Sequence, residues 1–174
     1  MSRAIFPVAA YCRRMDDLTP DDLHHLRRCV ALAREALDAG AEPFGSLLVD
    51  PGGTVLREER NETSAGDQTR HPELELARWA ATNVAEDVRP RCIVYTSGEH
   101  CPMCSAGHAW VGLGRIVYAG STAQLSAWRS SWGLAAGPVL PLSINAVAPG
   151  VPVSGPAPEL EVELRELHQR AAGG

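Results

Sequence analysis

The sequence predicts an α/β fold, a three-layer sandwich in which one sheet is covered by helices on both faces. Three observations predict it. An amphipathic helical pattern starts near residue 19, two extended runs joined by a Gly-rich turn follow, and helical and extended patterns then alternate. With 174 residues, 45% of them hydrophobic, the chain is long enough to bury a core of its own. We therefore expect a single domain over residues 1–174, with its core at about 20–135.

The first helix is predicted over residues 19–40. Thr19 can cap it, Pro20 suits the first helical position, and the two carboxylates that follow lie where the helix dipole favours negative charge. Gly40 can end the helix. Apolar residues recur between them at spacings of three and four, namely Leu23, Leu26, Val30, Ala33 and Leu37.

Two strands are predicted next, over residues 44–49 and 54–60, joined by a turn that contains Asp50, Pro51 and two glycines. Helices and strands then alternate until a Pro- and Gly-rich segment begins. The remaining helices are expected over residues 71–86, 101–111, 122–132 and 159–170, and the remaining strands over 91–96, 115–119 and 139–142.

Composition and charge exclude several classes of protein. The sequence contains no lysine, which excludes Schiff-base lysine chemistry and the lysine of a P-loop from this chain. The net charge of −5 argues against affinity that comes mainly from phosphate neutralisation, so nucleic acid is an unexpected partner. No apolar run reaches the roughly 20 residues of a membrane span, and the apolar residues 4–11 lack the pattern of a signal peptide. We expect a cytoplasmic protein.

Two short motifs have the composition of a catalytic zinc site. One is His71-Pro72-Glu73 and the other is a Cys-x-x-Cys pair, Cys101 and Cys104. One imidazole and two thiolates are three ligands, the number that leaves a tetrahedral ion one position for water. Glu73 follows His71 by two residues, so it can face that water without binding the metal, take its proton and pass protons on. Five cysteines with one close pair also suit metal binding in a reducing compartment.

The chain resembles the cytidine and deoxycytidylate deaminase superfamily, and most closely its guanine-deaminase branch. The resemblance covers residues 23–119 and rests on motifs in the order and approximate spacing of that family: Pro43-Phe44-Gly45, Asn61, His71-x-Glu73, Tyr95-Thr96-Ser97-x-Glu99-x-Cys101-Pro102-Met103-Cys104, and Trp110.

The resemblance implies a fold, a cofactor and roles for particular residues. The fold is a mixed five-stranded sheet between helices, assembled as a homodimer. His71, Cys101 and Cys104 would bind one Zn²⁺ per chain, and Glu73 would shuttle protons. Asn61 would hydrogen-bond a polar edge of a base, while Phe44 and Trp110 would lie against its rings.

Two residues depart from the family pattern. Pro72 stands where the family usually has alanine, which is compatible with a helix that has His71 as its N-cap and Pro72 at its first position. His100 replaces the proline that normally precedes the first cysteine, and it is a further candidate for substrate contact.

The expected substrate is a nucleobase or a related amino-substituted nitrogen heterocycle, acted on together with water. The sequence argues against guanine itself as the substrate. Guanine recognition would need a carboxylate between Glu99 and Glu159, and no Asp or Glu occurs there. The segment 126–132 instead contains Trp128 and Arg129, which suit an aromatic lid with one cation.

Two other functions remain open at this point. One is a tRNA-specific adenosine deaminase, against which the acidic charge, the absence of lysine and the large side chain of Phe44 argue. The other is a non-catalytic interaction domain that zinc stabilises. For single residues, Phe44 and Trp110 could be ordinary core residues and Asn61 a turn residue.

Overall fold

A mixed five-stranded sheet forms the middle layer of the structure, a computed structural model that describes residues 18–173. Its strands are β1 (Gly45–Val49), β2 (Val55–Arg60), β3 (Ile93–Gly98), β4 (Ile116–Gly120) and β5 (Val153–Ser154), in the order β2-β1-β3-β4-β5. Strand β1 is antiparallel to β2 and β3, whereas β3, β4 and β5 run parallel. The beginning of β1, the end of β2 and the carboxyl ends of β3 and β4 therefore lie at one end of the sheet.

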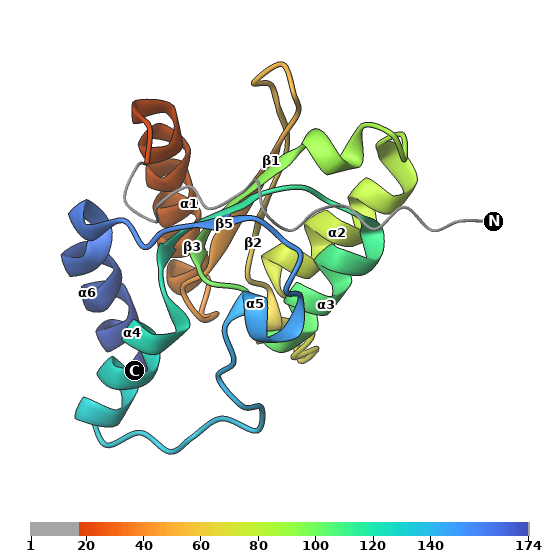
Figure 1. Cartoon of the computed structure of the whole chain (residues 1–174). Coiled ribbons are helices and arrows are strands. Elements are labelled where there is room, and N and C mark those ends of the chain that lie inside the picture. The colour runs from red at the N-terminus through yellow and green to blue at the C-terminus, as the bar shows by residue number, and fades with distance from the viewer. Residues whose placement is uncertain (1–17, 174) are drawn as a thin grey trace.

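Helices cover both faces of this sheet (Figure 1), which confirms the predicted three layers. On one face lie α1 (Pro20–Asp38), α4 (Thr122–Ser131) and α6 (Glu161–Ala172). On the other lie α2 (Pro72–Asn83), α3 (Pro102–Val111) and the short α5 (Ile144–Val147). Short 3-10 helices are formed by Thr63–Ala65, Arg89–Arg91 and Pro158–Leu160.

The alternation of side chains along the strands divides the core between the two faces. In β4, Val117 and Ala119 pack under α1, α4 and α6, whereas Ile116 and Tyr118 pack against Ile144 of α5. Strand β1 is buried along its whole length because both of its faces are covered. The residues at the ends of the sheet are thus attached to a strand that is buried and paired on both sides.

The first helix begins as predicted. Thr19 forms a capping box with Asp22, in which each side chain accepts a hydrogen bond from the backbone of the other residue. Pro20 occupies the first helical position.

The prediction of a strand over residues 139–142 is wrong. Those residues form no strand, and Val139 and Leu140 are exposed. Pro138 and Pro141 cannot donate to a strand ladder, whereas Val153 and Ser154 pair with β4 and complete the sheet. The carboxylate of Glu99 accepts hydrogen bonds from the backbone N–H groups of Thr122 and Ile144, which fixes the Pro- and Gly-rich segment to the end of β3.

Other boundaries differ from the predicted ones by a few residues. Helix α2 ends at Asn83 rather than near residue 86, and α6 begins at Glu161 after a 3-10 turn. The apolar residues 4–11 and one of the five cysteines, Cys12, lie outside the described residues. None of the helices within residues 18–173 combines the length and apolar character that a membrane crossing requires.

Candidate metal centre and active site

Two helices begin at the metal-ligand motifs, and both begin in the same way. His71 is the N-cap of α2 and Cys101 is the N-cap of α3, each with extended backbone and each followed by a proline at the first helical position. The prediction that His71 caps a helix with Pro72 inside it is confirmed. Because α2 and α3 pack side by side, their N-terminal dipoles converge on one point, where they favour thiolates.

Three donor atoms meet at that point. The Sγ atoms of Cys101 and Cys104 are 3.5 Å apart, and each lies 3.6 Å from His71 Nδ1. A tetrahedral zinc ion with Zn–S bonds of about 2.3 Å and Zn–N bonds of about 2.0 Å requires ligand separations close to these. The donor set of one nitrogen and two sulfurs therefore fits zinc in chemistry and in spacing.

The ionisation of the two thiols is unequal. The Cys104 thiol donates to the sulfur of Cys101, which lowers the pKa of Cys101 to about 4. The same hydrogen bond, together with burial, raises the pKa of Cys104. The hydrogen bond with Cys101 raises the pKa of His71. The neighbouring thiol and imidazole thus favour the thiolate form of Cys101.

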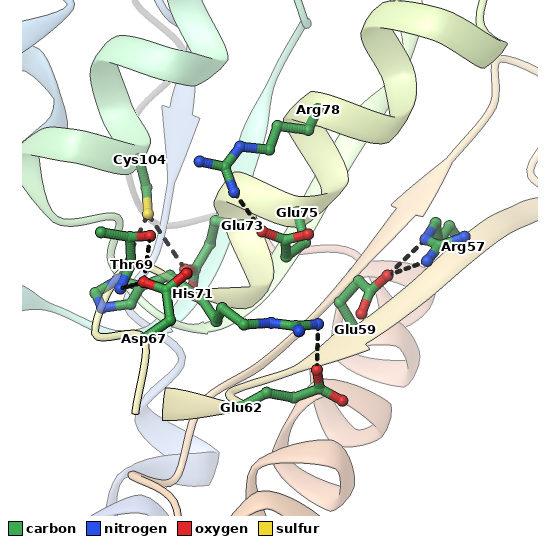
Figure 2. Close-up of polar contacts among 11 residues, drawn as sticks. Arg57, Glu59, Glu62, Asp67, Thr69, His71, Glu73, Glu75, Arg78 and Cys104 are labelled. Carbon is green, nitrogen blue, oxygen red and sulfur yellow. Dashed lines mark hydrogen bonds and ion pairs between the residues drawn. The ribbon is translucent and has the colours of Figure 1, made fainter. Parts of the chain in front are cut away.

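Glu73 faces this cluster from the first turn of α2. Figure 2 shows its side chain and that of Cys104 directed toward each other, with Cys104 Sγ 3.6 Å from Glu73 Oε2. Burial raises the pKa of the Glu73 carboxyl. A buried carboxylate that touches the ligand cluster without belonging to it has the placement of a proton carrier.

The other oxygen of Glu73 is held by two buried hydroxyl groups of the sheet. Thr96 Oγ1 lies 2.9 Å from both Glu73 Oε1 and the carbonyl oxygen of Gly98, so its proton can be given to either. Ser46 Oγ lies 3.2 Å from Glu73 Oε1 and 2.9 Å from Thr96 Oγ1. These contacts fix the carboxyl plane and leave Oε2 directed toward the cluster. Neither hydroxyl group could be assigned to the site from the sequence, where Ser46 stands in a strand pattern and Thr96 only inside the cysteine motif.

Phe44 and Asn61 lie at the same end of the sheet. Phe44 precedes β1 and is half-buried, and its carbonyl accepts a hydrogen bond from the backbone N–H of Asn61, which follows β2. The Asn61 side chain is buried, and its Oδ1 accepts from both the backbone N–H and the hydroxyl of Thr63. The amide oxygen of Asn61 therefore stabilises the turn to Thr63. The amide nitrogen of Asn61 makes no hydrogen bond within residues 18–173.

The Phe44 ring lies against the end of β3, and Gly98 makes this approach possible. A Cβ atom added at Gly98 would be 2.8 Å from Phe44 Cε1, so we expect Gly98→Ala to displace the ring and lower the free energy of unfolding by about 1–3 kcal/mol. Chemical denaturation measures this loss. Gly150→Ala is the control, because its added Cβ meets no atom within 4 Å, and an equal loss in both variants would contradict the prediction.

Trp110 is not brought to these residues. Its indole is 90% exposed in the last turn of α3, whereas the cysteine ligands lie in and before the first turn. At 1.5 Å per residue, Trp110 is about 13 Å along the helix from Cys101. The geometry of a single chain therefore does not support the expectation that Trp110 lies against a base.

His100 does not belong to the donor cluster. It is buried, its ring stacks edge-on against His108 at 5.5 Å, and burial lowers its pKa. Neither of its ring nitrogens has a hydrogen-bond partner within residues 18–173, and it is not one of the atoms that converge as metal donors. Its position beside Cys101 in the sequence thus does not make it a ligand.

Trp128 and Arg129 lie on α4, beside two neighbouring cavities. Trp128 is buried and lines the smaller one with Phe44, whereas Arg129 lines the larger one and forms an ion pair of 3.7 Å with Glu42. His168 of α6 lines both cavities, and its ring centroid is 5.0 Å from that of Phe44. A helical pattern does not show which histidine of a helix faces a cavity, so no sequence signal singles out His168.

The fold and the site together define a zinc-binding α/β protein, and comparison with known proteins identifies its family. Residues 19–120, more than half of the chain, match the family described as the cytidine and deoxycytidylate deaminase zinc-binding region. The chain belongs to this family. Because the matched residues contain His71, Cys101 and Cys104, zinc is the metal of the donor cluster.

Curated relatives include several kinds of deaminase. A probable cytosine deaminase from Schizosaccharomyces pombe is 34% identical over 109 residues, which cover 63% of this chain and 66% of the relative. Guanine deaminase from Bacillus subtilis is 36% identical over 95 residues, covering 54% of this chain and 61% of the relative. A tRNA-specific adenosine deaminase from Agrobacterium fabrum is 26% identical over 95 residues, covering 55% and 62%. The matches thus span less than two thirds of the length of each relative.

Among solved structures, guanine deaminase from Nitrosomonas europaea superposes with a TM-score of 0.65 at 20% identity, over 90% of this chain and 86% of that one. This similarity covers more of the chain than the matched family region does. At this identity it demonstrates the fold alone.

Proposed function

We propose that this protein is a zinc-dependent hydrolytic deaminase that acts on a nucleobase or a related amino-substituted nitrogen heterocycle and releases ammonia. The observation that carries the proposal is the placement of Glu73. Its Oε2 faces the donor cluster of His71, Cys101 and Cys104, while its Oε1 is fixed by the sheet. A structural zinc site does not need a buried carboxylate beside its ligands, whereas a hydrolytic deaminase site needs one to transfer protons.

The reaction replaces the carbon–nitrogen bond of the exocyclic amine with a carbon–oxygen bond from water. Bound zinc supplies the Lewis acidity that activates water at neutral pH. Glu73 accepts a proton from the water, delivers it to the ring nitrogen next to the reacting carbon, and carries the next proton to the departing amine. Burial keeps the Glu73 carboxyl out of bulk solvent, so that its protons go to the substrate.

Other side chains hold the substrate in this proposal. The half-buried ring of Phe44 offers a flat surface for an aromatic ring. The amide nitrogen of Asn61, which has no partner within residues 18–173, can donate to an oxo group or ring nitrogen. The names of the relatives, cytosine deaminase and guanine deaminase, support a base as substrate.

Thr96 is expected to set the turnover rate through Glu73. In Thr96→Val the carboxyl loses a hydrogen bond of 2.9 Å without a change in side-chain shape, so kcat should fall about tenfold or more while KM changes little. Steady-state kinetics separates the two constants. Thr96→Ser retains the hydroxyl and should restore most of the rate; if both variants lose activity equally, Thr96 acts through packing instead.

An ammonia-release screen of the zinc-loaded protein tests the proposed function. It should contain guanine, isoguanine, cytosine, 5-azacytosine, aminotriazines, adenine and pterins, with the matching nucleosides. Release from one of these bases at a rate that requires zinc is the expected result. A protein that binds zinc but releases ammonia from none of them would be the zinc-stabilised interaction domain considered above.

Deamination of a tRNA adenosine is the other activity that the screen has to address. Anticodon stem-loops are therefore included, at several salt concentrations. Salt-sensitive binding of the stem-loops, together with formation of inosine, would mean that the substrate is tRNA and not a free base. The net charge of −5 argues against such binding.

A homodimer and a cytoplasmic location complete the proposal. The indole of Trp110 on the outer surface of α3 is the kind of exposed aromatic group that a partner subunit covers. Thiolate ligands stay reduced in the cytoplasm. Light scattering of the purified protein tests the dimer directly.

A further inference from the structure

A cavity of about 230 Å³ lies between α4, α6 and the loop that precedes β1. The two helices lie side by side in Figure 1. Part of the cavity wall is apolar, with Leu125, Leu134 and the indole of Trp132. The other part presents three groups that can form hydrogen bonds, from Glu42, Arg129 and His168. A cavity that combines apolar walls with a few convergent polar groups is a usual form of a small-molecule site.

The cavity lies beside the candidate active site. Its residues Glu42 and Pro43 directly precede Phe44 in the chain, and the His168 ring packs against the Phe44 ring with a centroid separation of 5.0 Å. The Phe44 ring is thus in contact with a residue of the cavity wall, His168, at the end of the sheet where the candidate active site lies.

Two polar groups in the cavity lack strong partners. His168 is 9% exposed and forms no hydrogen bond within residues 18–173. Burial, with a further contribution from the charge of Arg129, lowers its pKa to about 4, so at neutral pH its ring has one donor and one acceptor. The Arg129 guanidinium approaches Glu42 only to 3.7 Å, which is too long for a hydrogen bond, and its N–H groups make no hydrogen bond within residues 18–173.

We propose that this cavity receives the far edge of the substrate ring, and that Arg129 and His168 select a ring that carries an oxo or anionic acceptor there. The inference rests on the proposed deaminase function. A guanidinium has donors only, so an amino group at the same position would leave it unpaired and repel it, whereas a carbonyl oxygen accepts from it. Trp132 covers the apolar face of the ring. The favoured class is an oxo-bearing amino heterocycle, and all-amino rings are excluded.

Binding to zinc-loaded Glu73→Gln protein tests this without turnover. Calorimetric titration compares two pairs of probes that differ at an oxo group: guanine with 2,6-diaminopurine, and cytosine with 2,4-diaminopyrimidine. We expect the oxo member of at least one pair to bind about tenfold or more tightly than its diamino counterpart. When Arg129→Met is introduced into the Glu73→Gln protein, that preference should disappear. Arg165→Met, at an exposed position of α6, should leave the preference unchanged in the same background.

His168→Phe keeps the ring that packs on Phe44 and removes its nitrogens, and it should weaken binding of the oxo probe several-fold; circular dichroism checks that the variant is folded. Equal affinities within both pairs, absence of binding by any probe, or Arg129→Met behaving like Arg165→Met would overturn the inference. Ammonia release by the protein with Glu73 intact is measured separately. If the protein releases ammonia but binds the oxo and diamino probes equally, this inference alone is refuted. If it binds the oxo probes selectively but releases no ammonia, the proposed function is refuted.

Discussion

Glu73→Gln is expected to reduce the rate of ammonia release by about 10²- to 10⁴-fold, because a positioned proton carrier contributes a factor in this range to the rate. Glutamine keeps the shape of the side chain and can still accept from Thr96 and Ser46, so the fold and the zinc content should be unchanged. What it loses is the ability to take a proton from water and return it. Ammonia release, zinc stoichiometry and the unfolding midpoint are measured on the same preparation.

Glu75→Gln is the matched control for this variant. Glu75 lies in the same first turn of α2, but it is partly exposed and pairs with Arg78 on the outside of the helix, as Figure 2 shows. Its loss should change turnover less than twofold, because surface ion pairs contribute little. An unimpaired rate in Glu73→Gln, with a normal Glu75→Gln protein, would refute the proton-carrying role.

Cys104→Ala is expected to lower zinc affinity by more than about 100-fold, since even the loss of a group outside the ligand set can cost that much. The change removes one of two sulfur donors from a set of three, and the remaining imidazole and thiol cannot hold the ion in competition with a chelator. Zinc per chain, measured by elemental analysis after dialysis against a chelator, should fall from one toward zero, and turnover should disappear with it.

Cys92→Ala separates metal loss from a general effect of losing a buried thiol. Cys92 is as fully buried as Cys104, but it lies beneath α2 and outside the donor cluster. It should retain its zinc at a modest cost in stability. If Cys104→Ala kept a full complement of zinc under the same dialysis, the assignment of the donors would be wrong.

The parts of the site that follow from local sequence could be predicted. His71 and Cys101 each precede a proline, and a residue before proline is extended, which is what an N-cap needs. The Cys-x-x-Cys spacing places both sulfurs at one helix start, and Glu73 is two residues from His71 on the same turn. The donor types and the carboxylate therefore indicated zinc chemistry before their positions were known.

Contacts between distant segments could not be predicted in the same way. The apolar spacing of residues 139–142 indicates a strand, but a strand needs a free edge and N–H donors, and the short β5 occupies that edge instead. Helical spacing could not show that Trp110 faces outward or that His168 faces inward, because the pattern gives the periodicity of a helix and not the neighbour that it meets.

The sequence by itself determined the metal chemistry, the caps of the principal helices and the order of most elements, since each depends on residues a few positions apart whose backbone preferences are intrinsic. Tertiary structure alone decided which hydroxyl groups hold Glu73, which edge β5 joins, and how α4 and α6 enclose a cavity beside Phe44. Those features arise where segments far apart in the chain exclude water from a shared surface, and no local preference encodes that pairing.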